Sequence, residues 1–280
     1  MRRTLVLGAA LALLGGCASI ADRPATVERM YVISCGENHV KDLARWSAPD
    51  AGKSAVFLNH CYLIKHARGW MLWDTGNSDA FAALPNGNSV LGGMLVQIMR
   101  KPLTESLKEI GVAPADIQYL AMSHLHGDHA GNANLFAAAT LYMQAVEYDI
   151  AFGPEPQKYG FQAANYARLR DSRVVKLAGD HDVFGDGSVL IKAAPGHTIG
   201  HQVLFVRLAQ TGPVVLSGDV VHNAANWAAR RVPALNFNAD QSAVSMQMVE
   251  QLMARSGARL WINHDPEQGK SMPKSPAYVQ

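Results

Sequence analysis

Residues 123–132 read Ser-His-Leu-His-Gly-Asp-His-Ala-Gly-Asn, and this stretch decides what the rest of the chain must build. Imidazole nitrogen and carboxylate oxygen are the ligands that borderline metals such as zinc accept where no thiolate is offered. An extended segment projects alternate residues to one side, so His124 and His126 can converge on one metal. The glycine that follows permits a bend, after which Asp128 and His129 can face a second metal. The stretch therefore predicts a binuclear metal site.

These ligands are too few for two metals, and three later stretches supply the remainder. Each stretch is an apolar, strand-like run that closes on a polar residue beside a turn residue. A rigid sheet presents ligands in this way, on the loops at the ends of its strands. The candidate ligands are His197 in residues 193–198, Asp219 in 217–219 and His264 in 261–265.

The motif and its later partners resemble the metallo-β-lactamase superfamily over nearly the whole chain, and within it the N-acyl homoserine lactonase group. The motif order carries the resemblance, together with Cys-Tyr-Leu-Ile at 61–64, Leu-Trp-Asp-Thr-Gly at 72–76 and Pro-Gly-His at 195–197. The resemblance implies a single-domain α/β fold, an αββα sandwich. The chain has two halves in which strands precede a helix, which is consistent with that architecture.

The resemblance also implies two divalent metal ions, zinc above all, with iron, cobalt or manganese as alternatives. It places His124, His126 and His197 on the first metal, Asp128, His129 and His264 on the second, and Asp219 as a bridge between them. Asp74 matches a position that orients the ligand histidines in the family.

One position departs from the lactonase pattern. Lactonases of this group often carry a tyrosine three residues after the bridging aspartate, where it polarises the substrate carbonyl, and this chain has His222 there. An imidazole can donate the same hydrogen bond or protonate a leaving alkoxide. His222 is therefore a candidate catalytic residue beside Asp128 and Asp219, although a bystander role or a different substrate is equally compatible with the sequence.

The predicted activity is the opening of a lactone ring of the N-acyl homoserine type, the chemistry of quorum quenching. A hydroxide shared by two metals would attack the carbonyl carbon of this small-molecule substrate. Metallo-β-lactamase activity and hydrolysis of another ester or a thioester are alternatives, because one fold serves many substrates. A non-catalytic zinc-binding lipoprotein is the alternative from another class. A bridging Asp219 argues against it, because structural zinc sites are closed and hold one metal.

The composition predicts an ordered globular protein. The chain has 280 residues, of which 49% are hydrophobic and 17% charged, enough for one large domain with a substantial core. A net charge of +2 without a dense lysine or arginine stripe predicts no nucleic-acid partner. The sequence does not fix the oligomeric state.

The first residues read as an export signal rather than as part of the fold. A basic pair precedes the apolar run 5–14, and Gly-Gly-Cys ends at Cys17. This ending resembles a lipobox, in which the cysteine is lipidated and becomes the new N-terminus. We expect an exported protein of the bacterial periplasm or outer membrane, attached to the membrane only through Cys17. An ordinary secretory signal with an incidental cysteine is the alternative. The predicted organisation is a signal peptide at 1–17, a tether at 18–29 and the hydrolase domain at 30–280.

The remaining cysteines and the insertion each have more than one possible interpretation from the sequence. Cys35 and Cys61 can pair in an oxidising compartment or remain buried thiols. The insertion at 77–102 suits a lid or substrate wall, a surface helix docked on the core, or a subunit interface. His201 is expected to pack in the core rather than support the ligands. Solvent or turn positions are expected for His39, His60, His66 and His181, and a solvated charge pair for Arg230 and Arg231.

Residue periodicity places the secondary structure along the chain. Helices are expected at 103–110, 133–139, 146–151 and 244–254, and strands at 29–34, 55–64, 70–73, 117–122, 174–177, 189–191, 203–206, 214–216 and 258–262.

Overall fold

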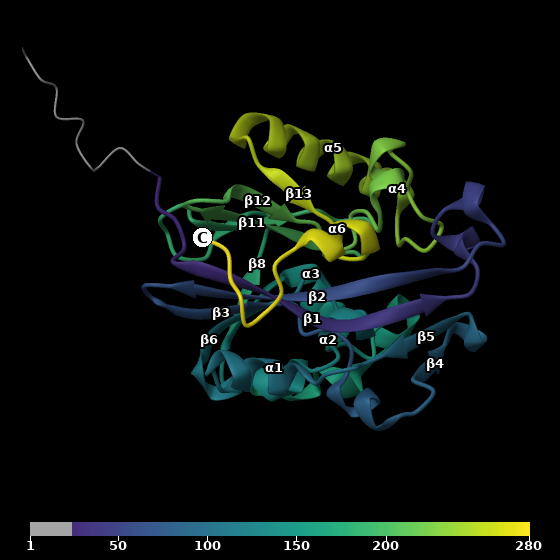
Figure 1. Ribbon diagram of the computed structural model, residues 1–280, viewed down its shortest axis with the longest axis horizontal. Helices are drawn as coiled ribbons and strands as arrows, with labels where there is room; N and C mark the ends of the chain where they lie inside the picture. The colour runs from purple at the N-terminus through teal and green to yellow at the C-terminus, as the bar shows by residue number, and fades with distance from the viewer. Residues whose placement is uncertain (1–23) are drawn as a thin grey trace, which may run out of the picture.

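Two long antiparallel strands, β1 (Arg29–Val40) and β2 (Ala55–His66), form the centre of the computed structural model, which describes residues 24–280 (Figure 1). Side chains alternate between the two faces of these strands. Ile33 enters the hydrophobic core on one face and Val32 enters the core on the other. Both faces of the sheet are therefore buried, one against helices and the other against a second sheet.

The two sheets account for all the strands in this part of the chain. The larger has eight strands in the order β4-β5-β1-β2-β3-β6-β7-β8, and the smaller has five in the order β13-β12-β11-β10-β9. The further strands of the larger sheet are β3 (Gly69–Trp73), β4 (Asn88–Val90), β5 (Leu95–Ile98), β6 (Ile117–Ala121), β7 (Thr140–Gln144) and β8 (Val174–Leu177). Those of the smaller sheet are β9 (His181–Asp182), β10 (Val189–Ala193), β11 (Gln202–Leu208), β12 (Gly212–Leu216) and β13 (Arg259–Trp261).

Helices cover the outer face of each sheet, which completes the predicted αββα sandwich. The helices are α1 (Leu103–Ile110), α2 (Gly127–Ala130), α3 (Ala145–Ala151), α4 (Ala224–Ala228), α5 (Ala239–Ser256) and α6 (Pro266–Ser271). Figure 1 shows α5 on one side of the sandwich and α1 on the other. Three hydrophobic clusters match the layers: one under α1, one between the sheets and one under α5. The single-domain prediction is confirmed.

Most predicted elements are present, and the differences have local causes. The helix expected at 103–110 is α1 without change. Helix α5 begins at Ala239 rather than 244, because the Asn238 side chain accepts a hydrogen bond from the Gln241 N–H and caps a polar first turn. The insertion at 77–102 is not a surface helix: it contains the β4–β5 hairpin, which extends the larger sheet beside β1.

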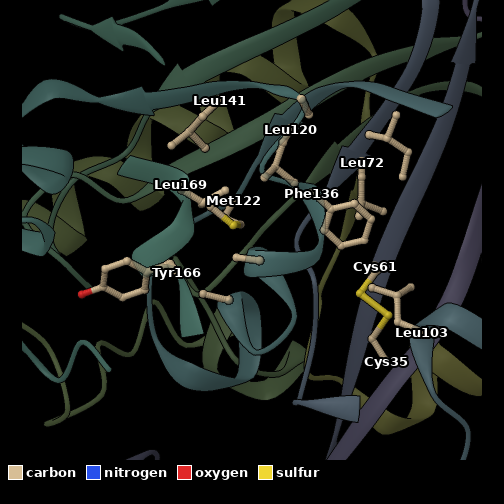
Figure 2. Close-up of a cluster of buried hydrophobic side chains, with 14 of the residues drawn as sticks. Cys35, Cys61, Leu72, Leu103, Leu120, Met122, Phe136, Leu141, Tyr166 and Leu169 are labelled. Carbon is tan, nitrogen blue, oxygen red and sulfur yellow. A yellow bond between two sulfur atoms is a disulfide. The ribbon is translucent and has the colours of Figure 1, made fainter. Parts of the chain in front are cut away.

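Cys35 and Cys61 form a disulfide between β1 and β2, which decides between the two alternatives left by the sequence. Figure 2 shows this disulfide at the side of the cluster that contains Leu72, Leu103 and Phe136. The bond joins neighbouring strands within the buried face and ties the centre of the larger sheet together.

The carboxyl ends of several strands meet at one edge of the sandwich. β3 runs parallel to β6, and β12 runs parallel to β13. β10 and β12 both run antiparallel to β11, so they share a direction. The Gln202 N–H at the start of β11 donates to the Ser123 carbonyl after β6 at 2.9 Å, which joins the two sheets at this edge. The loops that carry the metal-binding motif and its later partners therefore come together here.

The two ends of the described chain lie at the opposite edge. β11 leaves the motif edge and ends at Leu208, which forms a bridge with Val27. The carbonyl of Gln280 accepts a hydrogen bond from the N–H of Gln210 at 2.8 Å. Val27 is buried, so the folded body includes part of the segment that was predicted to be a tether.

The signal peptide at 1–17 and the candidate lipidation site Cys17 lie outside the described residues. Between residues 24 and 280, no helix has the length and apolar character needed to cross a bilayer.

Candidate metal centre

Every predicted ligand lies at the edge where the strand ends meet. His124 and His126 follow β6, and Asp128 and His129 lie in the short helix α2. The remaining ligands follow strands of the smaller sheet: His197 after β10, Asp219 after β12 and His264 after β13. The structure gathers them into adjoining groups whose ligand atoms lie within 4.8 Å of one another.

The first cluster consists of three imidazoles. The Nδ1 atom of His126 lies 2.9 Å from Nε2 of His124 and 3.0 Å from Nε2 of His197. The second cluster combines two imidazoles and a carboxylate. Nε2 atoms of His129 and His264 lie 3.3 Å apart, and Oδ2 of Asp128 is 3.8 Å and 3.7 Å from them.

Asp219 lies between the two clusters and faces both. Its Oδ1 atom is 3.1 Å from Nε2 of His129 and 3.0 Å from Nε2 of His264. Its Oδ2 atom is 3.3 Å from Nε2 of His197 and 4.0 Å from Nε2 of His124. One carboxylate therefore offers one oxygen to each cluster, which is the geometry of a bridging ligand.

Hydrogen bonds on the far side of the rings fix which nitrogen faces inward. The Nδ1–H of His264 donates to the Leu58 carbonyl at 2.8 Å, and the Nδ1–H of His197 donates to Oδ1 of Asn236 at 2.8 Å. The Nε2–H of His126 donates to the Tyr159 carbonyl at 3.3 Å, and the Nδ1–H of His129 donates to Oδ2 of Asp74 at 3.1 Å. Each inward nitrogen of a neutral ring then carries a lone pair. Such outer hydrogen bonds are the usual support of metal-ligating histidines.

Convergent lone pairs and an unpaired oxygen fit metal ions in these clusters. Asp219 Oδ1 is buried, yet it accepts no hydrogen bond from any residue between 24 and 280. Buried polar atoms without partners are costly in proteins, and a cation would satisfy both this oxygen and the surrounding nitrogens. The clusters thus provide ligand sets for two divalent metal ions.

The charges of the site agree with that assignment. Burial lowers the pKa of His124 and of His197 well below the usual histidine value, which favours the neutral rings that bind metals. Burial alone would raise the pKa of Asp219, but His264 and His129 lower it well below its usual value, so Asp219 is a carboxylate. Burial lowers the pKa of His129, but Asp219 and the other nearby carboxylates raise it well above its usual value, so this ring holds a proton that a bound metal ion would displace.

Two residues outside the ligand set orient the ligands. Asp74 follows β3 in a left-handed conformation (φ 58°), and its Oδ1 accepts a hydrogen bond from the Ser123 N–H at 2.6 Å while Oδ2 holds His129. This is the orienting position that the resemblance implied. His201 does more than pack: its Nε2 accepts from the Asp219 N–H at 2.9 Å and its Nδ1–H donates to the Ala194 carbonyl at 3.0 Å. The expectation of simple packing was therefore wrong.

His222 lies beside the ligand clusters, as its position three residues after Asp219 suggested. Its Nε2 lies 3.2 Å from Oδ2 of Asp219, and its ring stacks on that of His264 with centroids 5.5 Å apart. Its Nδ1 is buried and has no hydrogen-bond partner in residues 24–280. The ring of His222 also lines the cavity described next.

A cavity of about 600 Å³ opens over the clusters. Asp128, Asp219 and His222 face it, and the insertion at 77–102 supplies part of its wall, as the substrate-wall interpretation predicted. The apolar side chains along the wall include Trp46, Phe57, Val90, Leu91, Leu95, Ile199, Leu235 and Phe237.

Two asparagines and one glutamate support the site, although the sequence analysis did not single them out. Asn38 on β1 donates to Oδ2 of Asp128 at 2.7 Å, and Asn236 holds His197. Glu147 on α3 bonds to the loops that follow β6 and β10. Their residue types are common on surfaces, so only the long-range contacts reveal them.

The other singled-out histidines and arginines lie away from the clusters. His60 and His66 are buried rather than solvated: His60 bonds to the Asn263 carbonyl at 2.8 Å, and His66 bonds to Asp186 at 2.9 Å. His39 and His181 are half-buried. Arg230 pairs with Glu250, and Arg231 bonds to Asn226 and Ser47, so neither is part of the ligand clusters.

Comparison with known proteins agrees with this geometry. The sequence profile of the metallo-beta-lactamase superfamily matches residues 55–254. The N-acyl homoserine lactonase AttM of Azorhizobium caulinodans is 31% identical over 230 residues, which cover 78% of this chain and 85% of AttM. The N-acyl homoserine lactonase AiiA of Bacillus thuringiensis subsp. kurstaki is 29% identical over 258 residues, which cover 91% of this chain and all of AiiA (100%).

A solved structure shares the fold. It is an N-acyl homoserine lactone hydrolase with the product N-hexanoyl-L-homoserine bound at its catalytic metal centre. It is 28% identical, covers 91% of this chain and 100% of its own, and superposes with a TM-score of 0.80. The family profile, the lactonase relatives and the shared architecture confirm the resemblance seen in the motif. The chain therefore belongs to the metallo-beta-lactamase superfamily and is a hydrolase of that superfamily.

Proposed function

We propose that the protein opens the ring of N-acyl homoserine lactones with two divalent metal ions in its site. The observation that carries the proposal is Asp219, whose two carboxylate oxygens face separate ligand clusters beneath an apolar cavity. The lactonase relatives, and the solved relative that holds a ring-opened product at its metal centre, support this substrate class.

Two bound metals would supply an activated water nucleophile and positive charge beside the reacting carbonyl. The residues that would hold them are His124, His126 and His197 for the first, Asp128, His129 and His264 for the second, and Asp219 for both. Zinc is our proposed metal, because nitrogen and carboxylate ligands in buried clusters suit it. Elemental analysis of purified protein tests this, and two zinc ions per chain are expected.

His222 and Asp128 are the side chains that we place against the substrate. The imidazole of His222 lies at the cavity and can donate a hydrogen bond to the carbonyl or to the leaving ring oxygen. Asp128 is held by the amide of Asn38, and its carboxylate can orient the attacking nucleophile. Both groups are fixed by neighbours, so little ordering remains when the substrate binds.

The apolar wall of the cavity supports an acyl chain on the substrate. Phe57, Leu91 and Leu235 face the same space as the clusters. Each buried methylene contributes about 0.8 kcal/mol, so two methylenes in contact with the wall favour binding by roughly tenfold. We therefore expect acylated homoserine lactones to react in preference to simple γ- and δ-lactones.

A substrate panel tests the proposal directly. Purified, zinc-loaded protein is assayed by proton release with N-hexanoyl and N-decanoyl homoserine lactones, simple lactones, a cephalosporin, a thioester and an aryl ester. The acylated lactones should react at least tenfold faster than the others. If the cephalosporin or the thioester reacted fastest, the lactone assignment would be wrong while the ligand clusters would stand.

Removal of the bridge tests the metal requirement. Asp219→Ala should lose most of its metal and reduce lactone hydrolysis to background, because neither cluster keeps its shared ligand. Asp149→Ala is the matched control, since Asp149 is an exposed aspartate whose one ion pair within residues 24–280 is with Lys176. An Asp219→Ala protein with wild-type rates would contradict the two-metal proposal.

We also propose that the protein is exported and anchored through a lipidated Cys17. The signal-like first residues motivate this, and the Cys35–Cys61 disulfide supports it, because structural disulfides persist in oxidising compartments. Labelling of cells with a radioactive fatty acid should mark the wild type and not Cys17→Ala. Equal labelling of the two forms, or none in either, would overturn the proposal.

A further inference from the structure

Glu147 is a buried carboxylate that the proposed chemistry does not use. It lies on α3 with 1% of its surface exposed, and none of the ion pairs among residues 24–280 includes it. A buried charge is costly unless hydrogen bonds satisfy it. Its partners therefore indicate why the fold retains a carboxylate at this place.

The partners of Glu147 belong to two loops that are far apart in sequence. Its Oε1 accepts from the Leu125 N–H at 3.2 Å and from the Thr198 hydroxyl at 2.9 Å. Its Oε2 accepts from the Gly200 N–H at 2.9 Å. Both oxygens are occupied by neutral donors, and one of them links the two loops.

These two loops carry every ligand of the first cluster. Leu125 stands between His124 and His126, and Thr198 directly follows His197. Helix α3 contributes no ligand of its own. A carboxylate on α3 thus fixes the spacing between two separately folded strand ends, and the ligand nitrogens lie only 3.0 Å apart across that junction.

Close packing at the same junction supports a fixed distance. A Cβ atom on Gly200 would lie 2.6 Å from Cβ of Glu147 and 2.9 Å from its backbone nitrogen. The loop after His197 therefore lies directly against α3, and only glycine allows this approach. The hydrogen bonds and the packing hold the loop from two directions.

The second cluster has a different carboxylate support. Asp74 bonds to His129 and to the Ser123 N–H, and it makes no hydrogen bond to the loop after His197. Glu147 and Asp74 are thus two buried carboxylates with different partners: Asp74 bonds directly to a ligand of the second cluster, and only Glu147 bonds to the loop after His197.

We propose that Glu147 is the positioning residue of the first metal site, because it clamps the loops of His124, His126 and His197 together, while Asp74 supports the second site. This inference rests on the binuclear site of the proposed function but not on its substrate. It predicts that the affinities of the two metals can be altered separately from outside the ligand set.

The test is cobalt binding to metal-free full-length protein, with Glu147→Gln and Asp74→Asn compared with wild type. In Glu147→Gln an amide NH2 replaces one carboxylate oxygen and faces a donor, so at least one hydrogen bond is lost. We expect one cobalt equivalent to bind about 10- to 100-fold more weakly, as is typical when a supporting hydrogen bond of a ligand is lost. Asp74→Asn should weaken the other equivalent.

Paramagnetically shifted imidazole N–H resonances identify which site has changed. The first cluster exposes the Nε2–H of His126 and the Nδ1–H of His197 to bound cobalt, and the second exposes the Nδ1–H of His129 and of His264. Glu147→Gln should change the first pair of signals and leave the second. Glu267→Gln is the matched control, because Glu267 is exposed and, in the described part of the chain, forms an ion pair with Lys270 alone.

Two results would overturn the proposal: unchanged affinities in Glu147→Gln, or equal weakening of both equivalents with both pairs of signals changed. If Glu147→Gln does not fold, Thr198→Val decides, since it removes one hydrogen bond to the carboxylate and should weaken the first equivalent several-fold. Unaltered cobalt binding in Thr198→Val would then refute the clamp. Failure to hydrolyse lactones leaves these results unaffected, whereas wild-type protein that binds a single cobalt would refute the binuclear site itself.

Discussion

His60 shows how a single buried side chain couples this fold to pH. Its Nδ1–H donates to the Asn263 carbonyl at 2.8 Å, and its Nε2 accepts from Nζ of Lys274 at 2.6 Å. Burial, together with the Lys274 charge, lowers the pKa of His60 to about 3. The unfolded chain binds a proton at this histidine near pH 6.5, but the folded protein does not, so acid favours unfolding between these two values.

We predict that His60→Gln reduces this acid sensitivity. Glutamine is able to donate one hydrogen bond and accept the other, but it does not titrate. Between pH 7 and pH 4.5, the free energy of unfolding should fall by roughly 2 kcal/mol less in the variant than in the wild type. Urea unfolding of both metal-free proteins at the two pH values measures the difference. Parallel pH profiles would contradict the prediction.

Leu91 is strained at the mouth of the cavity. Its φ of 53° lies in the left-handed region, and the side chain is 47% exposed while it lines the cavity. That conformation costs a non-glycine residue roughly 1–2 kcal/mol. Backbone strain of this kind concentrates at functional sites, so we connect Leu91 with recognition of the acyl chain.

Leu91→Gly should separate stability from substrate preference. Glycine relieves the backbone strain but gains freedom in the unfolded chain, so stability should change by less than about 1 kcal/mol. The KM for N-decanoyl homoserine lactone should rise several-fold, while that for N-butanoyl homoserine lactone stays the same. Leu84→Gly is the control, since Leu84 is also exposed but does not line the cavity. Equal effects on both substrates would remove Leu91 as a chain-length determinant.

Among the helices and strands, those whose own residues carry a clear hydrophobic pattern could be predicted from the sequence. The strands that deliver ligands have β-branched cores and end at turn residues, as in β10 and β12. The hairpin β4–β5 has no such signal: its strands are short, and they form because β5 pairs with β1. β7 was missed as well, because it is a short strand whose partners, β6 and β8, are distant in sequence.

In the metal centre, too, residues within a local motif could be predicted, and residues that act through distant partners could not. The ligand residues could be predicted because histidine and aspartate in this order are rare by chance. Asn38, Asn236 and Glu147 could not, since each acts through a partner from 22 to 90 positions away. His201 carried a weak signal, its position four residues after His197, but its bond to the Asp219 N–H depends on how two loops meet.

The Cys35–Cys61 disulfide should stabilise the pairing of β1 and β2. It closes a loop with a sequence separation of 26 between β1 and β2. A loop of this length restricts the unfolded chain by roughly 3 kcal/mol. Cys35→Ala with Cys61→Ala should lower the free energy of unfolding by about that amount, measured by urea denaturation without reductant. If the variant matched the oxidised wild type, the bond would not stabilise the fold.

For the whole molecule, the ligand clusters join the two sheets. The first cluster combines His124 and His126 from the larger sheet with His197 from the smaller, and Asp219 reaches into both clusters. Metal bound only by the folded state stabilises it by about 2.7 kcal/mol at a concentration one hundred times its Kd. Removal of metal should therefore weaken the contact between the halves.

Chelation removes two such metals, which together contribute about 5.4 kcal/mol. The Tm should therefore fall by roughly 10–20 °C, because a domain of this size shifts by roughly 2–4 °C for each kcal/mol. Calorimetry before and after treatment with a chelator measures the shift, and added zinc should restore the original value. A Tm that does not respond to chelation would mean that the clusters are held by the protein alone.

The placement of the chain ends has a practical meaning for immobilisation. Val27 and Gln280 both lie beside the far end of β11, at the edge opposite the ligand clusters. A bead or electrode coupled through Gln280 would hold the molecule with its cavity turned toward the bulk solution. The lipid anchor that we propose at Cys17 would turn the same edge toward the membrane, so substrate would arrive from the aqueous phase.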